Sequence, residues 1–218
     1  MMRRRRPTRS GPLRQVSAFR AASALVLGMA FAGTVVAATQ SAPMPVTAFG
    51  PDDAPVVLTV FSDFACEPCA HLAVVLQGVV EARPNKVRVV FRHLPAVDSR
   101  GRDAHLASLA AAEQGRFFEF HSLAFANQNR LTPEDTVSMA AQLGLDLERF
   151  AQSLASPGLT NVLAHDRAEA EANGVSQTPS VLLNGVAIPG PITLETLLQR
   201  IDRSDPGPSV DWRLRPEH

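Results

Sequence analysis

The sequence predicts an α/β fold with an inserted helical domain, and three observations support this class. Two short runs rich in β-branched and apolar residues, 56–61 and 86–92, are typical of buried strands. A long block of helical periodicity, residues 98–173, follows them. A strand hairpin and a final helix, residues 180–202, come last. This order of elements indicates strands and helices packed in layers around one core, with a helical insertion.

The first half of the predicted domain is a strand, a helix and a second strand. Residues 56–61, Val-Val-Leu-Thr-Val-Phe, form a run short enough for one buried strand. The next stretch, residues 66–83, has apolar residues at the i, i+3, i+4 spacing of an amphipathic helix. Pro68 falls in its first turn, where the missing N–H costs nothing, and Pro84 ends it. Residues 86–92 then alternate polar and apolar side chains, which predicts a second strand.

The second half begins with the helical block, residues 98–173, which is predicted to be a series of helices. One helix has a clear start, with Thr132 before it, Pro133 at its first position and Asp135 nearby. After the block, Asn184-Gly185 separates two short apolar runs. This dipeptide is a strong signal for a hairpin turn, and a closing helix is expected after it.

The charge of the chain is divided unevenly, although its formal net charge is zero. Residues 1–40 hold seven of the 21 basic residues and no acid, which leaves fourteen basic against 21 acidic residues in the remainder. Nucleic acid requires Lys and Arg clustered on a folded surface. The acidic body therefore disfavours nucleic acid as a partner.

The N-terminal segment is typical of a secretory signal peptide. An Arg-rich start leads into the uncharged stretch 21–38, which ends in small residues. We expect residues 1–38 to be a signal peptide cleaved near Ala38, with an uncleaved N-terminal anchor as the alternative. In either case the body is expected outside the cytoplasm, periplasmic or otherwise extracytoplasmic. Residues 39–50 are predicted to be a linker.

Cys66 and Cys69 are the only cysteines of the chain. One pair does not make a disulfide scaffold, and a chain of 218 residues can bury an ordinary core. A structural zinc site needs about four ligands, and the histidines lack the spacing to complete one, so no metal is expected. Outside the cytoplasm thiols tend to be oxidised. The pair therefore indicates thiol-disulfide exchange, with two core cysteines brought together by chance as the alternative.

Four motifs occur in a fixed order along the chain. They are Phe-Ser-Asp-Phe-Ala-Cys-x-x-Cys at 61–69, Val-Phe-Arg-His-Leu-Pro at 90–95, Gln-Gly-Arg-Phe-Phe-Glu-Phe-His at 114–121 and Gly-Val-Ser-x-Thr-Pro-Ser at 174–180. In this order the motifs resemble the DsbA-like thioredoxin-domain family of exported disulfide oxidoreductases. The resemblance implies a thioredoxin-like fold over residues 51–203, with the helical insert at about 98–173. It implies no cofactor, and residues 204–218 are expected to be a flexible tail.

Thiol-disulfide exchange requires one accessible thiolate and a second thiol that resolves the mixed disulfide. Cys66 is the predicted nucleophile, because it begins a helix whose unpaired N–H groups and dipole lower the pKa of a thiol. Cys69, one turn later, is the predicted resolving and more buried thiol. By the resemblance, Thr178 and Pro179 are assigned to substrate binding, with Pro179 in cis. An ordinary trans proline at the start of a strand is the alternative.

Glu67 and Pro68 are interpreted as residues that tune the redox couple. A carboxylate beside Cys66 disfavours its thiolate. Members of the family often place proline directly after the first cysteine, whereas here proline precedes the second. We therefore expect a milder couple than that of the strongest oxidants of the family.

Proton transfer to the second cysteine often uses a buried acid on the preceding strand in thioredoxin-like proteins, but the corresponding residue here is Val60. Asp63 is the nearest acid and is one candidate for this proton transfer. The alternative, given equal weight, is that Asp63 is an exposed loop residue or a helix cap. His71 is expected to be a solvated helix residue. The histidines expected at the core edge or on the surface are His93, His105, His121 and His165.

The sequence predicts an exported thiol-disulfide oxidoreductase that acts on unfolded or reduced secreted proteins. A separate partner, soluble or in the membrane, is expected to reset its redox state, and a monomer is favoured. The alternatives are a client-specific reductase or isomerase, and a peptide-binding holdase whose disulfide is idle. The insert is expected to cover the side of the cysteines, and its apolar residues are interpreted as core rather than as a peptide groove. These residues are Phe117, Phe118, Phe120, Leu123 and Phe125.

Overall fold

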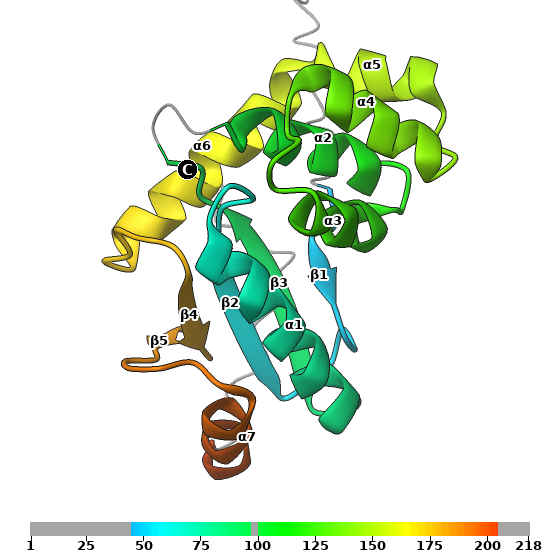
Figure 1. Ribbon diagram of the computed structural model, residues 1–218. Helices are drawn as coiled ribbons and strands as arrows, with labels where there is room; N and C mark the ends of the chain where they lie inside the picture. Colours follow the sequence, from blue (N-terminus) through cyan, green and yellow to red (C-terminus); the bar gives the residue numbers. More distant parts are fainter. Residues whose placement is uncertain (1–44, 97–99, 205–218) are drawn as a thin grey trace, which may run out of the picture. The chain divides into compact units, whose positions relative to one another are not determined.

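The computed structural model describes residues 45–96 and 100–204, and its centre is a five-stranded mixed sheet (Figure 1). The strands are β1 Ala48–Phe49, β2 Val56–Ser62, β3 Val87–His93, β4 Ser180–Leu183 and β5 Val186–Ala187. Their order across the sheet is β1-β3-β2-β4-β5. β2 lies in the middle, parallel to β3 and antiparallel to β4. The predicted α/β class, thioredoxin-like with an inserted helical domain, is confirmed.

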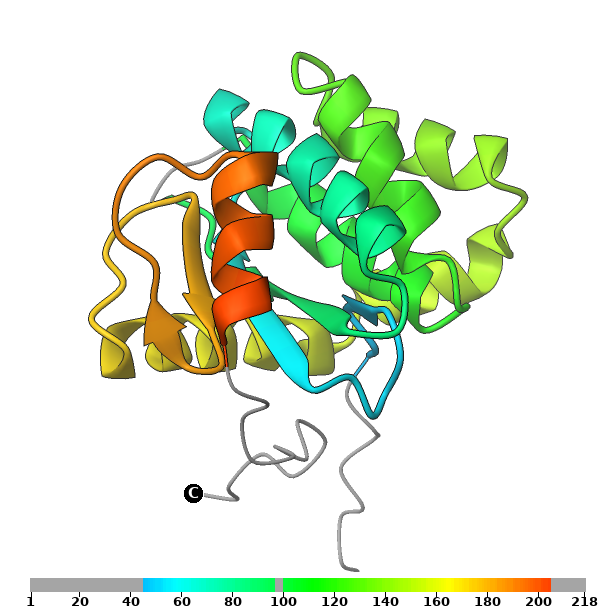
Figure 2. The same ribbon diagram turned by 90° about the horizontal axis from the view of Figure 1, so that it is seen from below.

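Helices cover both faces of the sheet (Figure 2). On one face lie α1, Glu67–Ala82, and α7, Leu194–Arg203; α6, Pro157–Ala172, crosses the other. Successive side chains of a strand point to opposite faces, so Val60 joins the core under α1 and α7. Phe61, the next residue, packs with Ala170 of α6. β2 is thus covered on both faces, which fixes the position of the loop that follows it.

The other helices of the insert form a bundle whose core also includes Phe64, Cys69 and Phe91. These helices are α2 Arg102–Ala112, α3 Phe117–Ala126, α4 Pro133–Gln142 and α5 Leu147–Leu154. α4 begins where the sequence predicted, with Thr132 as N-cap and with Asp135 completing a capping box. Phe117, Phe120 and Phe125 are buried in this core, and Phe118 and Leu123 pack against it partly buried. The interpretation of these apolar residues as core is confirmed.

The stretch predicted as a linker, residues 39–50, contains a strand in its described part. β1 pairs antiparallel with β3, with Ala48 opposite Val90. Thr47 is buried, and its hydroxyl donates a hydrogen bond to the carbonyl of Phe91 at 3.0 Å. A strand of two residues is too short to show a periodicity, which is why the sequence pattern did not reveal it.

The hairpin predicted at Asn184-Gly185 is present between β4 and β5. Asn184 and Gly185 have φ angles of 48° and 83°, the left-handed conformation that these two residue types tolerate best. The side chain of Asn184 also accepts a hydrogen bond from the N–H of Val57 at 2.8 Å. The turn therefore joins β4 to the start of β2 as well as to β5.

Two further expectations, the signal peptide or anchor at residues 1–38 and most of the tail at 204–218, lie outside the described residues. Within the described part of the chain, no helix is long and apolar enough to cross a membrane.

Candidate active site

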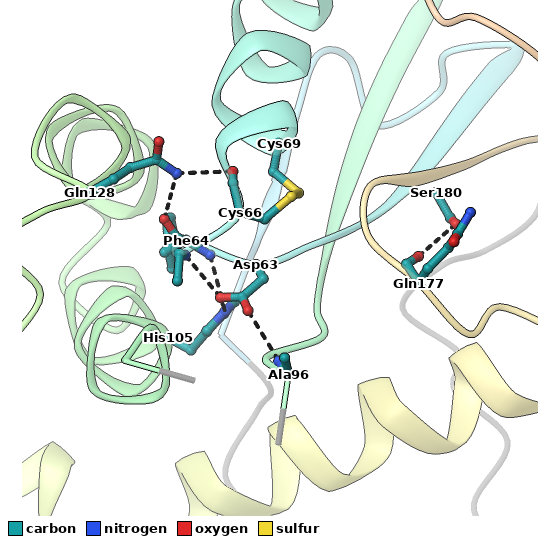
Figure 3. Close-up of a disulfide and its surroundings, with 10 residues drawn as sticks. Asp63, Phe64, Cys66, Cys69, Ala96, His105, Gln128, Gln177 and Ser180 are labelled. Atoms are coloured by element: carbon teal, nitrogen blue, oxygen red, sulfur yellow. Dashed lines mark hydrogen bonds and ion pairs between the residues drawn. A yellow bond between two sulfur atoms is a disulfide. The ribbon is translucent and has the colours of Figure 1, made fainter. Parts of the chain in front are cut away.

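Cys66 and Cys69 form a disulfide at the N-terminus of α1, with their α-carbons 5.3 Å apart (Figure 3). Cys66 is the N-cap residue of the helix, with extended backbone angles, and its carbonyl accepts the N–H of Cys69 at 3.1 Å. Cys66 is half-buried, whereas Cys69 is only 2 % exposed. Cys66 is therefore partly accessible to solvent, whereas Cys69 is shielded by the core that it shares with the insert.

The environment of Cys66 combines a stabilising and an opposing charge effect. The first N–H groups of a helix have no partners within the helix, and together with the helix dipole they favour a thiolate at this position. Glu67 is the first residue of α1 and is exposed, and Pro68, also exposed, lies in the first turn. A thiolate on Cys66 would thus be favoured by the helix and disfavoured by the neighbouring carboxylate.

Thr178 and Pro179 lie at the same end of the sheet as the cysteines. Ser180 of β4 pairs with Phe61 of β2, and the antiparallel register places Pro179 level with Ser62, the last residue of β2, and Thr178 just beyond it. The Thr178–Pro179 peptide bond is cis, as expected, and both residues are half-buried. The fold therefore brings this loop, which is more than a hundred residues away in sequence, to the edge that carries Cys66.

Asp63 is a buried carboxylate shortly before the cysteine pair, so the alternative of an exposed loop residue or helix cap is wrong. It is 4 % exposed, and the N-cap of α1 is Cys66. Its carboxylate accepts the N–H groups of Ala65 and Ala96 at 3.0 and 3.1 Å, and its Oδ1 lies 3.2 Å from His105 Nε2. Burial raises the pKa of Asp63, but these hydrogen bonds outweigh burial and lower that pKa to about 2.

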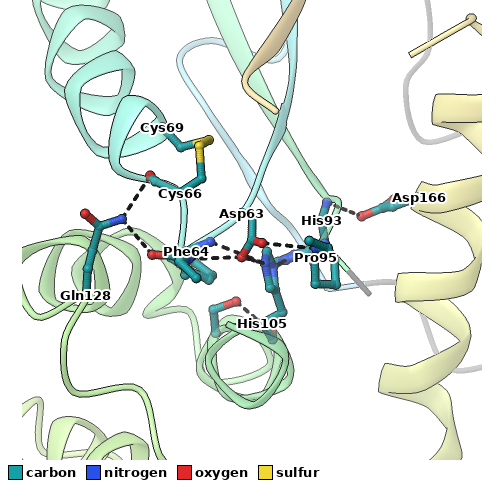
Figure 4. Close-up of polar contacts among 12 residues, drawn as sticks. Asp63, Phe64, Cys66, Cys69, His93, Pro95, His105, Gln128 and Asp166 are labelled. Atoms are coloured by element: carbon teal, nitrogen blue, oxygen red, sulfur yellow. Dashed lines mark hydrogen bonds and ion pairs between the residues drawn. A yellow bond between two sulfur atoms is a disulfide. The ribbon is translucent and has the colours of Figure 1, made fainter. Parts of the chain in front are cut away.

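His93 and His105 are fully buried, so the expectation that they lie at the core edge or on the surface is wrong. Their Nδ1 atoms are 2.8 Å apart, which is a hydrogen bond (Figure 4). Burial lowers the pKa of His105, although the neighbouring Asp63 acts in the opposite direction. A row of three polar side chains, Asp63, His105 and His93, thus extends from the active-site loop into the core.

Gln128, between α3 and α4, joins the insert to the active-site loop. Its side-chain amide donates to the carbonyl of Phe64 at 2.7 Å and to that of Cys66 at 3.0 Å. Sequence reasoning missed this residue, because a lone glutamine in a polar connection carries no pattern that predicts a contact over 62 residues. The expected position of the insert beside the cysteines is explained by these two bonds.

One group of residues outside this site has the composition of a metal centre. Ligand atoms of His165, Asp166 and Glu169 on α6 lie within 4.8 Å of one another. Arg92 forms ion pairs with the two carboxylates of this group, with its Nε 2.6 Å from Glu169 and 3.7 Å from Asp166. The guanidinium supplies the positive charge there, so we interpret the group as a buried ion pair between β3 and α6.

A central mixed sheet, a disulfide at the start of the helix after β2 and a cis-proline loop beside it define a thioredoxin-fold protein with a redox-type cysteine pair. A comparison with known families agrees. The family model described as thioredoxin matches residues 43–203. The chain belongs to the thioredoxin family.

Solved structures support the DsbA-like resemblance of the motifs. A thioredoxin-like oxidoreductase from Silicibacter pomeroyi DSS-3 is 29 % identical, with a TM-score of 0.66 over 72 % of this chain and 90 % of that one. The thiol-disulfide exchange protein alpha-DsbA2 from Wolbachia pipientis is 19 % identical, with a TM-score of 0.66 over 72 % of this chain and 86 % of that one. BdbD from Bacillus subtilis is 20 % identical, with a TM-score of 0.65 over 74 % and 92 %. The last two show the shared fold.

Curated relatives in sequence are longer proteins. The Na(+)/H(+) antiporter NhaA 3 of Salinispora tropica is 36 % identical over 170 residues, which is 77 % of this chain and 25 % of the relative. The antiporter NhaA of Herminiimonas arsenicoxydans is 35 % identical over 158 residues, or 72 % of this chain and 25 % of the relative. The chain thus spans about a quarter of the length of these relatives, and ion transport is not carried over to it.

Proposed function

We propose that this protein is an exported thiol-disulfide oxidoreductase that exchanges disulfides with unfolded or reduced secreted proteins. The observation that carries the proposal is the contrast between the two sulfurs. Half-buried Cys66 lies at a helix N-terminus, and it is disulfide-bonded to Cys69, which is almost wholly buried. An accessible sulfur backed by a shielded one is the arrangement that this exchange requires.

In the proposed reaction a client thiolate attacks the sulfur of Cys66. The Cys66–Cys69 bond breaks, Cys69 leaves as a thiolate, and a mixed disulfide joins the client to Cys66. A second client thiolate then attacks the client sulfur of this mixed disulfide and releases Cys66 as a thiolate. The client gains a disulfide, the protein gains two electrons, and the two leaving thiolates take up the protons that the client thiols lost.

The loop at Thr178–Pro179 is the proposed site for the client chain. The support is its position at the edge of the sheet that carries Cys66 and its partial exposure. An extended client segment there could pair with the backbone before Pro179, as in proteins of the resembling family. The protein returns to the disulfide form only if a separate oxidant accepts its electrons, so we also propose a recycling partner, soluble or in the membrane. Export rests on the composition of residues 1–38, and a monomer remains our working assignment.

The two cysteine variants test this function. In Cys69→Ala the Cys66 thiolate can attack a disulfide of an oxidised client, and one client sulfur leaves as a thiolate. Because the Cys69 thiol that would resolve this mixed disulfide is absent, mixed disulfides between Cys66 and clients should accumulate and be released by a reductant. Cys66→Ser should form none. A peptide-binding holdase with an idle disulfide would instead suppress aggregation of unfolded clients equally in both variants and trap nothing, which would refute exchange.

The direction of exchange follows from the redox potential. The exposed Glu67 beside Cys66, and a proline directly before the second cysteine instead of directly after the first, favour a milder couple than that of the strongest oxidants. A client-specific reductase or isomerase is therefore the second candidate. Titration of the couple against glutathione distinguishes the candidates, because a potential near the top of the known range would exclude a reductase.

A further inference from the structure

The carboxylate of Asp63 is held close to the redox centre by the main chain. The carbonyl of Asp63 accepts the N–H of Cys66 at 3.1 Å, which closes a four-residue turn. Such a turn keeps its first and last α-carbons within about 7 Å of each other. Figure 4 shows Asp63 on the core side of the disulfide, facing His105 and the end of β3.

Three donors surround this carboxylate and favour its ionised form. The N–H groups of Ala65 and Ala96 and Nε2 of His105 lie 3.0, 3.1 and 3.2 Å from its oxygens. A carboxylate accepts all of these bonds, whereas a protonated acid would lose acceptor capacity. Because the pKa of Asp63 is about 2, its carboxylate stays ionised at every pH at which thiolates form and exchange.

The two histidines have defined roles in this arrangement. Since ionised Asp63 only accepts, we assign the proton to Nε2 of His105, which donates to Asp63 at 3.2 Å. The N–H of Phe64 also points at this nitrogen, from 3.4 Å, but a protonated Nε2 does not accept it. A neutral His105 then accepts at Nδ1, so His93 donates from its own Nδ1 across 2.8 Å. Both histidines therefore direct their protons toward Asp63 and remain uncharged in the core, where burial lowers the pKa of His105.

Other titratable or charged side chains interact with His105 or with its charged neighbours. The described ones are Arg102 on α2, Arg92 on β3, His121 on α3 and Asp166 on α6. Arg92 is paired with Asp166 and Glu169, and burial lowers the pKa of His121 to about 3. Among the described residues, Asp63 is thus the buried ionised group that belongs to the turn preceding Cys66.

We propose that the buried carboxylate of Asp63 is a tuning residue that disfavours the thiolate of Cys66 and makes the Cys66–Cys69 couple more reducing. This inference rests on the proposed function. A like charge nearby opposes ionisation of a thiol, and the strength of an oxidant depends on how far its reduced thiolate is stabilised. His105 is a positioning residue that keeps Asp63 ionised and partly compensates its charge.

The buried Asp63 should matter more than Glu67, which is next to Cys66 in sequence. Charges near the protein interior interact with an effective dielectric constant of about 20, against about 80 in water, so the same separation gives about four times the interaction. Glu67 is exposed and its field is screened by solvent and salt. Sequence proximity alone would rank the two residues in the opposite order.

Three matched variants test this inference by glutathione titration, in which oxidised protein and two glutathione thiols give reduced protein and glutathione disulfide. Asp63→Asn should shift the equilibrium constant about tenfold toward the reduced protein, which is about 30 mV for a two-electron couple. Thiolate absorbance should show a correspondingly lower Cys66 pKa. Glu67→Gln should change the constant about threefold or less, and Asp103→Asn, at an exposed position on α2, should leave it unchanged.

A second variant, expected to shift the redox equilibrium in the opposite direction, separates an effect of charge from an effect of altered structure. His105→Phe can pack against Phe64 and Phe91, and it removes one compensating donor while Asp63 keeps its charge. The couple should then become more reducing, opposite to Asp63→Asn. A purely structural role would move both variants in one direction or neither, and that result overturns the inference. So does an effect of Glu67→Gln larger than that of Asp63→Asn.

The test stays decisive if the Asp63 variant fails to fold. If Asp63→Asn does not fold, His105→Phe decides alone: a more reducing couple supports the inference, and an unchanged or more oxidising couple overturns it. The titration needs no client protein. Client trapping by Cys69→Ala can therefore succeed while the tuning role fails, so failure of the inference is distinguishable from failure of the proposed function.

Discussion

The side-chain amide of Gln128 donates a hydrogen bond to the backbone carbonyl of Cys66 at 3.0 Å, so a residue of the insert holds the N-cap of α1. The same nitrogen donates to the carbonyl of Phe64 at 2.7 Å. Two carbonyls on either side of Ala65 are thus fixed by one side chain. The insert does more than cover the core: it sets the backbone of the exposed turn that presents Cys66.

Gln128→Ala should lower the free energy of unfolding by about 2 kcal/mol, because two hydrogen bonds are lost at about 1 kcal/mol each. Urea denaturation of the oxidised protein measures this change. Gln128→Glu should be worse than the alanine variant, since its carboxylate oxygens would face two carbonyl oxygens. Asn129→Ala, at the exposed neighbouring position, is the control and should change stability by less than about 0.5 kcal/mol. Equal losses of unfolding free energy from the variants at 128 and 129 would contradict this role of the Gln128 side chain.

The buried ion pair between β3 and α6 leads to a second prediction. Arg92 and Asp166 have side chains 8 % and 1 % exposed, and Arg92 Nε is 2.6 Å from Glu169. Arg92→Met should cost about 3 kcal/mol of unfolding free energy, because it leaves buried negative charge less compensated. The control is Arg83→Met at the exposed Arg83–Asp202 pair, which should cost less than about 1 kcal/mol. Similar losses from both variants in urea denaturation would argue against this difference.

The capping box of α4 gives a third prediction. The Thr132 hydroxyl accepts the N–H of Asp135 at 3.3 Å, and the Asp135 carboxylate accepts the N–H of Thr132 at 3.3 Å. Thr132→Ala should therefore destabilise the protein by about 1 kcal/mol. Thermal unfolding by circular dichroism would detect the lower melting temperature. Thr132→Ser keeps the accepting oxygen and should retain most of the stability; an equal loss from serine would attribute the effect to the methyl group.

Local patterns explain why much of the fold and part of the site could be predicted from the sequence. The cysteine spacing, the Asn184-Gly185 turn and the N-terminal signal of α4 each depend on residues a few positions apart, and all three are present. The roles assigned to Cys66, Thr178 and their neighbours remain predictions. Their placement at one edge of the sheet follows from the register of β4 on β2.

The rest of the site depends on contacts between distant segments. β3 alternates polar and apolar residues, which predicts a polar face in solvent, yet the whole strand is buried. For Arg92 and the N–H of His93, Asp166 and Glu169 of α6 supply the partners, whereas Arg88 pairs with Asp52 and donates to the carbonyl of Gly50. No pattern near these residues in the sequence shows that a helix some seventy residues later will cover that face. The buried roles of Asp63 and His105 were missed for the same reason.

His121 gives the last prediction, a loss of stability in acid. Its ring packs against several aromatic residues, and burial lowers its pKa from 6.5 to about 3. Because the unfolded chain binds the proton first, stability is full above about pH 6.5 and falls as the pH drops toward about 3. Between about pH 7 and about pH 5 the loss from this residue should be about 2 kcal/mol.

Urea denaturation at several pH values measures this loss, and His121→Phe should remove it because the ring no longer titrates. His105 contributes in the same direction, since burial lowers its pKa too, so the variant should keep a smaller dependence on pH. An unchanged pH dependence in His121→Phe would mean that the ring binds a proton as readily in the folded protein as in the unfolded chain, which would contradict this prediction.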